Sequence, residues 1–185
     1  MPHPNILERT GACLVVVDVQ EAFRSAIPDF ALVASKVSTA VRGFQTLDVP
    51  ILITEQYPEG LGRTAEEILL ATAEGTEVIE KSAFSSCGAE VFVSRLEAIG
   101  ARQIVLCGFE THVCVSQTAH DLIDRGFQVH VMIDSVASRF SVDKEAGIAK
   151  MMAAGAVAST VEIAFFELMK DSKHEHFKEI QSLIR

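Results

Sequence analysis

The sequence predicts an α/β fold: three layers, α/β/α, around a six-stranded, mainly parallel, doubly wound sheet. Three observations lead to this prediction. Short apolar runs rich in Val and Ile alternate with longer helix-like stretches. The length of 185 residues suits one domain over 1–185, and 49% of the residues are hydrophobic, which allows a sizeable core. Alternating strands and helices form right-handed βαβ units, and such units build a parallel sheet covered on both faces.

Six apolar runs have the length of strands. They cover residues 12–19, 49–55, 77–81, 102–108, 127–134 and 156–160. The first run, ACLVVVDV, is apolar without a break up to Asp18, as expected for a strand that is buried on both faces. The segment DVQEAF follows it and contains no GxGxxG, which argues against a dinucleotide-binding domain.

The segments between these runs have the spacing of amphipathic helices. They cover residues 29–46, 65–71, 88–99, 113–125, 141–154 and 161–170. Thr64 is the predicted N-cap of the second helix. Gly100, Gly126 and Gly155 each follow a predicted helix and are expected to end it. The last residues, HEHFKEIQSLIR, are predicted to form an amphipathic turn or tail.

Composition excludes several classes of function. The net charge of −9 and the pI of about 5.1 argue against a nucleic-acid partner. No apolar run approaches the roughly 18 residues that a membrane span needs, and the N-terminus lacks the pattern of a secretory signal. The four cysteines, Cys13, Cys87, Cys107 and Cys114, form no CxxC pair, so neither a disulfide framework nor a structural zinc site is predicted. We therefore expect a cytoplasmic protein that acts on a small molecule.

Three residues capable of chemistry follow predicted strands. Asp18 ends the first strand, Lys81 ends the third, and Cys114 follows the fourth in the segment GFETHVC. Each has a structural alternative: a turn cap for Asp18, a solvated strand end for Lys81 and a core position for Cys114. In a parallel sheet, however, the carboxyl ends of the strands meet at one edge, where ligands bind. The sequence therefore predicts an active site that contains all three.

The segments VVVDVQEAF, EKSAFSS and LCGFETHVCVSQTAHDLIDRG resemble the isochorismatase-like cysteine hydrolases. The segments ITEQYPEGLGRT and HFKEIQSLI resemble the branch called isochorismatase-domain-containing proteins. The resemblance covers roughly residues 11–165. It implies a six-stranded parallel sheet between helices and a catalytic triad of Asp18, Lys81 and Cys114. It also implies a non-proline cis peptide bond between Phe109 and Glu110.

The resemblance implies a mechanism in which Cys114 is the nucleophile. Its position at a helix N-terminus near Lys81 leads us to expect a lowered thiol pKa. The thiolate would attack an amide carbonyl to form a thioester, and Asp18 would carry protons as general acid and base. Lys81 would stabilise negative charge. Backbone N–H groups of Cys114 and of the preceding loop would bind the oxyanion.

The loops at the carboxyl edge are expected to form the walls of a substrate pocket. The expected substrate-binding residues are Gln20, Phe23, Tyr57, Phe84, Glu110, Thr111, His112 and Val113. Arg139 is expected either to meet a substrate carboxylate or to pair with Asp143. His120 is predicted to be structural, and His174 and His176 are not predicted to bind metal.

Neither a metal nor any other cofactor is predicted. Nicotinamidases of this superfamily bind a metal through histidines that follow the second strand, and the segment TEQYPEG has none. Isochorismatases proper cleave a vinyl ether without a cysteine nucleophile. Since Cys114 is present, the leading prediction is a metal-independent cysteine hydrolase of a small amide or related C–N substrate. The alternatives are an isochorismatase-like ether hydrolase that uses Asp18 and Lys81, and a non-catalytic binding protein with the same fold.

Assembly into a homo-oligomer, a dimer or larger, is also predicted. The apolar segment VEIAFFELM contains more hydrophobic surface than one helix packed on a sheet requires. The alternative is a helix that packs wholly within its own domain.

Overall fold

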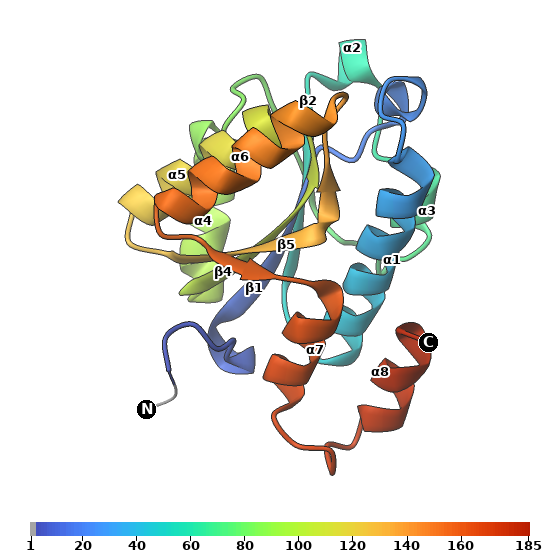
Figure 1. Ribbon diagram of the computed structural model, residues 1–185, viewed down its shortest axis with the longest axis vertical. Helices are drawn as coiled ribbons and strands as arrows, with labels where there is room; N and C mark the ends of the chain where they lie inside the picture. Colours follow the sequence, from blue (N-terminus) through green and yellow to red (C-terminus); the bar gives the residue numbers. More distant parts are fainter. Residues whose placement is uncertain (1–2) are drawn as a thin grey trace.

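The computed structural model describes residues 3–185, and its centre is a six-stranded sheet in which all neighbouring strands are parallel (Figure 1). The strand order is β3-β2-β1-β4-β5-β6, so the chain reverses its direction of winding between β1 and β4. This confirms the predicted doubly wound sheet. The strands are β1 (Ala12–Val17), β2 (Ile51–Gln56), β3 (Val78–Lys81), β4 (Gln103–Phe109), β5 (Gln128–Ala137) and β6 (Val157–Ser159).

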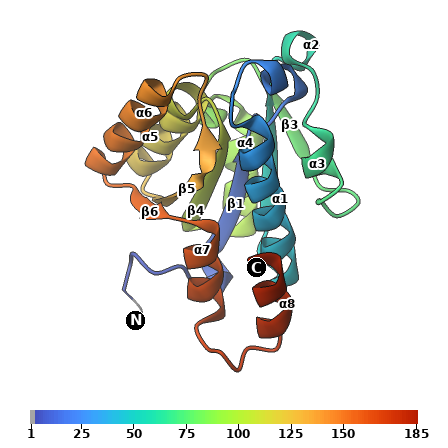
Figure 2. The same ribbon diagram turned by 45° about the vertical axis from the view of Figure 1, so that its right-hand side comes forward.

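Helices cover both faces of the sheet, as Figures 1 and 2 show together. Helices α1, α3, α7 and α8 pack on one face, and α4, α5 and α6 pack on the other. The helices are α1 (Phe30–Thr46), α2 (Pro58–Leu61), α3 (Glu66–Leu69), α4 (Glu90–Ile99), α5 (Ser116–Asp124), α6 (Ser141–Ala153), α7 (Val161–Met169) and α8 (Phe177–Leu183). Short helical turns also occur at Arg9–Gly11, Glu21–Ser25, Ser86–Gly88 and Thr111–Val115.

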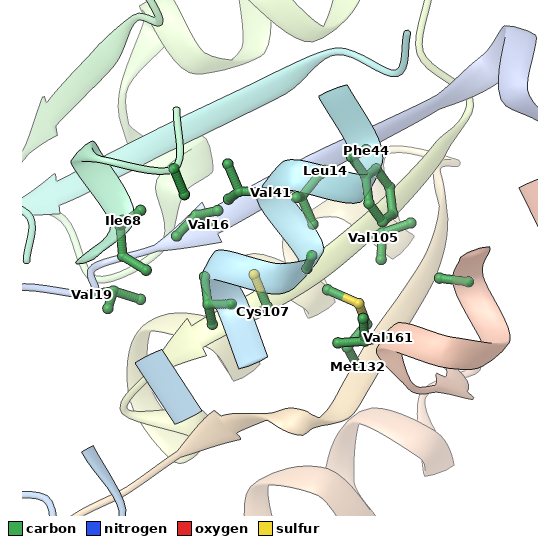
Figure 3. Close-up of a cluster of buried hydrophobic side chains, with 14 of the residues drawn as sticks. Leu14, Val16, Val19, Val41, Phe44, Ile68, Val105, Cys107, Met132 and Val161 are labelled. Carbon is green, nitrogen blue, oxygen red and sulfur yellow. The ribbon is translucent and has the colours of Figure 1, made fainter. Parts of the chain in front are cut away.

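Each face of the sheet has its own hydrophobic core, because successive side chains of a strand point to opposite faces. Leu14 and Val16 of β1 belong to the core beneath α1, where Val41 and Phe44 contribute from the helix (Figure 3). Cys13, Val15 and Val17 belong to the other core. All six residues of β1 are buried, which confirms the strand buried on both faces that ACLVVV predicts.

The structure corrects the expected start of the second predicted helix. Thr64 does not cap it; α3 begins at Glu66 and has no side-chain cap. Instead the backbone N–H and the hydroxyl of Thr64 donate to Oε1 of the buried Glu55, at 2.6 and 2.7 Å. A buried carboxylate needs such donors, so the Thr64 hydroxyl binds Glu55 and is not available to cap the helix. The contact fastens the loop after β2 to the sheet.

Other elements also differ from the predicted boundaries, and β5, expected over 127–134, extends to Ala137. The helix expected over 113–125 begins with a separate π-helical turn, Thr111–Val115, before α5 starts at Ser116. The C-terminal tail forms α8, which places Ile180 in the core beneath α1. Between residues 3 and 185, no helix has the length and apolar character needed to cross a bilayer.

Candidate active site

Asp18 lies immediately after β1, at the edge of the sheet where the strands have their carboxyl ends. Its backbone is left-handed, with φ of 52°, which turns the chain away from the strand direction. The side chain is buried and has two partners. Its Oδ1 accepts a hydrogen bond from the Thr54 hydroxyl at 2.7 Å, and its Oδ2 lies 2.7 Å from the Lys81 ammonium. Asp18 is therefore part of an ion pair and is not a simple turn cap.

Lys81 is buried at the end of β3, with its side chain 1% exposed. Its ammonium donates to Asp18, to Oε1 of Gln56 at 2.8 Å and to the carbonyl of Phe84 at 2.9 Å. The carbonyl of Ala83 lies 3.3 Å away. A buried ammonium is tolerated when its protons are bonded and its charge is paired, as here. The alternative of a solvated strand end is wrong.

Cys114 lies in the π-helical turn between β4 and α5 and is almost fully buried. Single π turns occur within helices at functional sites, since the extra residue displaces a side chain from the regular helical path. The turn and α5 are continuous, so the cysteine lies close to the N-terminal end of the combined helical segment. The thiol forms part of the wall of a cavity and is near Asp18 and Lys81.

Two glycines allow the close packing around this turn. Gly108 of β4 has φ of 127°, and a Cβ there would lie 2.0 Å from the carbonyl oxygen of Val17, the residue before Asp18. Gly147 of α6 packs against the π turn; a Cβ at this position would lie 2.9 Å from Cα of His112. Any larger residue would force these segments apart.

The structure corrects the expected pKa of Cys114. Burial raises the pKa of the thiol to about 12, and the hydrogen bond and charge of Asp18 also raise it, whereas the charge of Lys81 lowers it. The expected lowering fails because Lys81 is already paired with Asp18, so the thiol has little net positive field and is shielded from water. The resting thiol is protonated at neutral pH.

The expected cis peptide bond between Phe109 and Glu110 is not present, since every peptide bond of residues 3–185 is trans. The chain turns here through backbone torsions instead. Gly108 has φ of 127° and Glu110 has φ of 55°, both positive. These two torsions direct the chain from β4 into the π turn.

A cavity of about 420 Å³ opens in front of Cys114. Of the expected substrate-binding residues, Phe23, Phe84, Glu110 and Val113 line it. Sequence reasoning missed Ala22, Ala26, Gln56 and Leu61, which also line it. Gln56 ends the second strand, and the position of the other predicted site residues at strand ends was the signal that could have identified it.

The other four expected residues do not line the cavity. Gln20 is buried, and its amide binds the backbone of Gln56 and the carbonyl of Gly62, so it holds the loop after β2 in place. Tyr57 is 58% exposed outside the cavity. Thr111 is fully buried, and the ring of His112 bonds to the Ser138 hydroxyl at 3.0 Å. These side chains are directed elsewhere because successive residues of a turn or strand point in different directions.

Arg139 lines the cavity but does not pair with Asp143. Its Nε and Nη2 lie 3.2 and 3.1 Å from Oε2 of Glu110, and its backbone N–H donates to Oε1 of Glu110 at 3.2 Å. Asp143 instead lies 3.9 Å from Nε2 of His112. The segment after β5 is thus joined to the start of the π turn that contains Cys114.

Within residues 3–185, no group of three or more His, Cys, Asp and Glu side chains is placed to hold a metal ion.

The arrangement is that of an α/β protein with a buried Asp–Lys pair and a thiol at the carboxyl edge of a parallel sheet. The chain belongs to the isochorismatase family, because residues 12–163 match the Isochorismatase domain. Members of this family are generally hydrolases.

Curated relatives support this assignment over nearly the whole chain. Isochorismatase domain-containing protein 2 of Macaca fascicularis is 41% identical over 177 residues, which are 95% of this chain and 83% of the relative. Isochorismatase domain-containing protein 1 of Danio rerio is 39% identical over 168 residues, which are 91% of this chain. The chain spans only 59% of the length of that second relative.

Solved structures show the same fold. A protein described as MAR1 ribonuclease from Caenorhabditis elegans superposes on this chain with a TM-score of 0.92 at 36% identity. The superposition covers 97% of this chain and 92% of that protein. N-carbamoylsarcosine amidase from Thermoplasma acidophilum superposes with a TM-score of 0.70 at 24% identity and covers 82% of this chain and 97% of its own. At that identity the second comparison speaks for the fold alone.

Proposed function

We propose that the protein is a cysteine hydrolase that cleaves a small amide or a related C–N bond without a metal ion. The observation that carries the proposal is the buried pair of Asp18 and Lys81 beside the Cys114 thiol, in the wall of a cavity. A nucleophile, a proton acceptor and a fixed positive charge within one site are the groups that covalent hydrolysis requires.

In the proposed first half-reaction, Asp18 removes the thiol proton as the sulfur attacks the carbonyl carbon. Proton transfer to Asp18 has to accompany attack by the sulfur, because the pKa of the Cys114 thiol is raised to about 12 and little thiolate exists beforehand. A C–S bond forms, and the carbonyl electrons move to oxygen. The C–N bond then breaks, Asp18 gives the proton to the leaving nitrogen, and a thioester remains on Cys114.

In the proposed second half-reaction, water attacks the thioester while Asp18 accepts a proton from it. The C–S bond breaks, the acid leaves, and the proton returns from Asp18 to the sulfur. The sum is amide plus water to acid plus amine. Lys81 keeps the Asp18 carboxylate in place and compensates its charge whenever it is ionised.

The oxyanion would be bound by backbone N–H groups of the π turn, that of Cys114 among them. The N–H of Val113 is not available for this role, since it donates to the carbonyl of Glu110 at 2.9 Å.

Two structural neighbours have names that point to different substrates. One structural neighbour is by name an amidase of N-carbamoylsarcosine. Another is by name a ribonuclease, but a net charge of −9 and a cavity of about 420 Å³ suit a small substrate better than RNA. The proposed substrate is therefore a small molecule, and short RNA is included in the test as the alternative substrate.

The test is a screen of small amides, vinyl ethers and short RNA with the wild type, Cys114→Ala and Cys87→Ala. Amide turnover is expected in the wild type and Cys87→Ala, unchanged after EDTA, and lost in Cys114→Ala, with an acyl adduct on Cys114 in mass spectrometry. Cys87 is a buried cysteine outside the site and serves as the control. Turnover that survives in Cys114→Ala would favour ether hydrolysis. Activity on RNA alone, or no activity on any substrate, would overturn the proposal.

A further inference from the structure

Four charged side chains lie in or beside the site, and they occur as two ion pairs. Asp18 pairs with Lys81, and Glu110 pairs with Arg139. From this arrangement we infer that the cavity selects an uncharged substrate, the amide of a short apolar acyl group, and that Glu110 prevents Arg139 from binding anions. The inference rests on the proposed function and specifies its substrate class.

The first pair offers nothing to a charged substrate. The Lys81 ammonium has four acceptors for its three protons: Asp18, Gln56 and two backbone carbonyls. Both side chains are 1% exposed. An anionic group on the substrate would therefore find no free donor on Lys81 and would lie near the Asp18 carboxylate.

The second pair is at the cavity wall, where both Glu110 and Arg139 line the space. The Arg139 side chain is 50% exposed, but the Glu110 carboxylate lies 3.1 Å from its guanidinium and also accepts a hydrogen bond from the backbone N–H of Arg139. A substrate carboxylate bound to Arg139 would have to lie beside Glu110, and like charges at contact are strongly unfavourable. A substrate cation would have to compete with Arg139 for Glu110.

The rest of the wall is mainly apolar. Besides Gln56 and the thiol, it consists of small or hydrophobic side chains: Ala22, Phe23, Ala26, Leu61, Phe84 and Val113. Apolar walls favour an apolar acyl group by removing its surface from water. Charge pairing and wall composition thus point to the same substrate class.

The test compares alkylation of Cys114 by iodoacetamide and by iodoacetate, reagents of equal length that are neutral and anionic. In both, the sulfur displaces iodide, a C–S bond forms, and the thiol proton leaves through Asp18 to solvent. Rates are read from the Cys114 peptide by mass spectrometry and divided by those of N-acetylcysteine. The normalised preference for iodoacetamide is expected to be about tenfold or more.

Two variants of the second pair should shift this preference in opposite directions. Glu110→Gln uncovers the charge of Arg139, so the preference for the neutral reagent should fall. Arg139→Gln leaves the Glu110 carboxylate unpaired, so the preference should rise. Glu77→Gln is the matched control, because Glu77 pairs with Arg95 at 2.7 Å beside the amino end of β3, and there the preference should not change.

A wild-type preference equal to that of N-acetylcysteine would overturn the inference, as would a shift of both variants in the same direction. Use of two variants keeps the test decisive if one of them does not fold. The outcome can be distinguished from that of the proposed function. Selective alkylation without amide turnover would support a cavity that selects uncharged substrates and contradict the hydrolase. Amide turnover with unselective alkylation would support the hydrolase and contradict the selection of uncharged substrates.

Discussion

The Asp18 carboxylate has two neighbours that compete for its charge. Lys81 forms an ion pair with it, and in the proposed mechanism the Cys114 thiol gives it a proton. Because Asp18 contacts both groups, loss of Lys81 should also affect the thiol. This link makes Lys81 a test of the whole site.

Lys81→Met is expected to slow alkylation of Cys114 near neutral pH. Asp18 raises and Lys81 lowers the pKa of the thiol, and the substitution removes only the lowering effect. It also leaves Asp18 buried without its cation, which typically costs about 3–5 kcal/mol. Iodoacetamide labelling against pH and urea unfolding measure the two effects. Lys170→Met, at an exposed pair with Glu8, is the control and should cost less than about 1 kcal/mol; an unchanged labelling profile in Lys81→Met would contradict the role of Lys81.

His130 predicts how stability depends on pH. It is 1% exposed in β5, and neither ring nitrogen has a hydrogen-bond partner within the described residues. Burial lowers the pKa of the imidazole from 6.5 to about 4. Above pH 6.5 both folded and unfolded chains hold it neutral, so it has no effect there. As the pH falls from 6.5 to about 4, His130 is protonated in the unfolded chain but stays neutral in the folded chain. The free energy of unfolding therefore declines by about 3 kcal/mol.

Urea unfolding at several pH values between 7.5 and 4 measures this decline. His130→Phe should remove most of it, whereas His174→Asn, in the segment before α8, should leave it unchanged. If wild type and His130→Phe lost stability in parallel on acidification, other groups would be responsible for it.

At the level of elements, the π turn depends on how closely α6 approaches it. Gly147→Ala would add a Cβ 2.9 Å from the backbone of His112 and displace the turn that contains Cys114. The expected result is slower alkylation of Cys114 and lower turnover, although alanine favours the helix by about 1 kcal/mol.

Gly43→Ala is the control for this prediction. Its Cβ would lie 2.1 Å from the Phe165 ring, in the core on the opposite face of the sheet, so stability should fall while Cys114 reacts normally in the folded protein. Normal alkylation in Gly147→Ala would show that the approach of α6 does not position the thiol.

For the whole molecule, the apolar segment VEIAFFELM is largely accounted for within the chain. In α7 the side chains of Val161, Ala164, Phe165, Leu168 and Met169 are buried against the fold. Ile163 and Phe166 remain 45% and 41% exposed. The apolar surface left over for a partner is thus smaller than the sequence implies.

A homo-oligomer stays the prediction, with Ile163 and Phe166 within the contact. Sedimentation at micromolar concentration should show a dimer or larger species, and Phe166→Glu should shift it toward the monomer because a carboxylate would be buried. Leu32→Glu, at another exposed apolar position, is the comparison. A monomeric wild type would refute the prediction.

The alternation of apolar runs and amphipathic segments was sufficient to predict the sheet, the parallel direction of its strands and the three layers. A parallel strand is buried on both faces and therefore requires a continuous apolar run such as ACLVVV. The same logic placed Asp18 and Lys81 at one edge, because the end of each run marks the end of a strand. These features depend on local patterns, so one chain segment at a time is enough to recognise them.

Only the tertiary structure determined which charges meet and what they do to the thiol. Glu110 and Arg139 are far apart in the sequence and pair because β4 and β5 are neighbours in the sheet. The raised pKa of Cys114 follows from burial and from the charge of Asp18, which the charge of Lys81 only partly offsets. The sequence determined which groups reach the edge of the sheet; their protonation and pairing depend on distances and desolvation, and these exist only once the chain is folded.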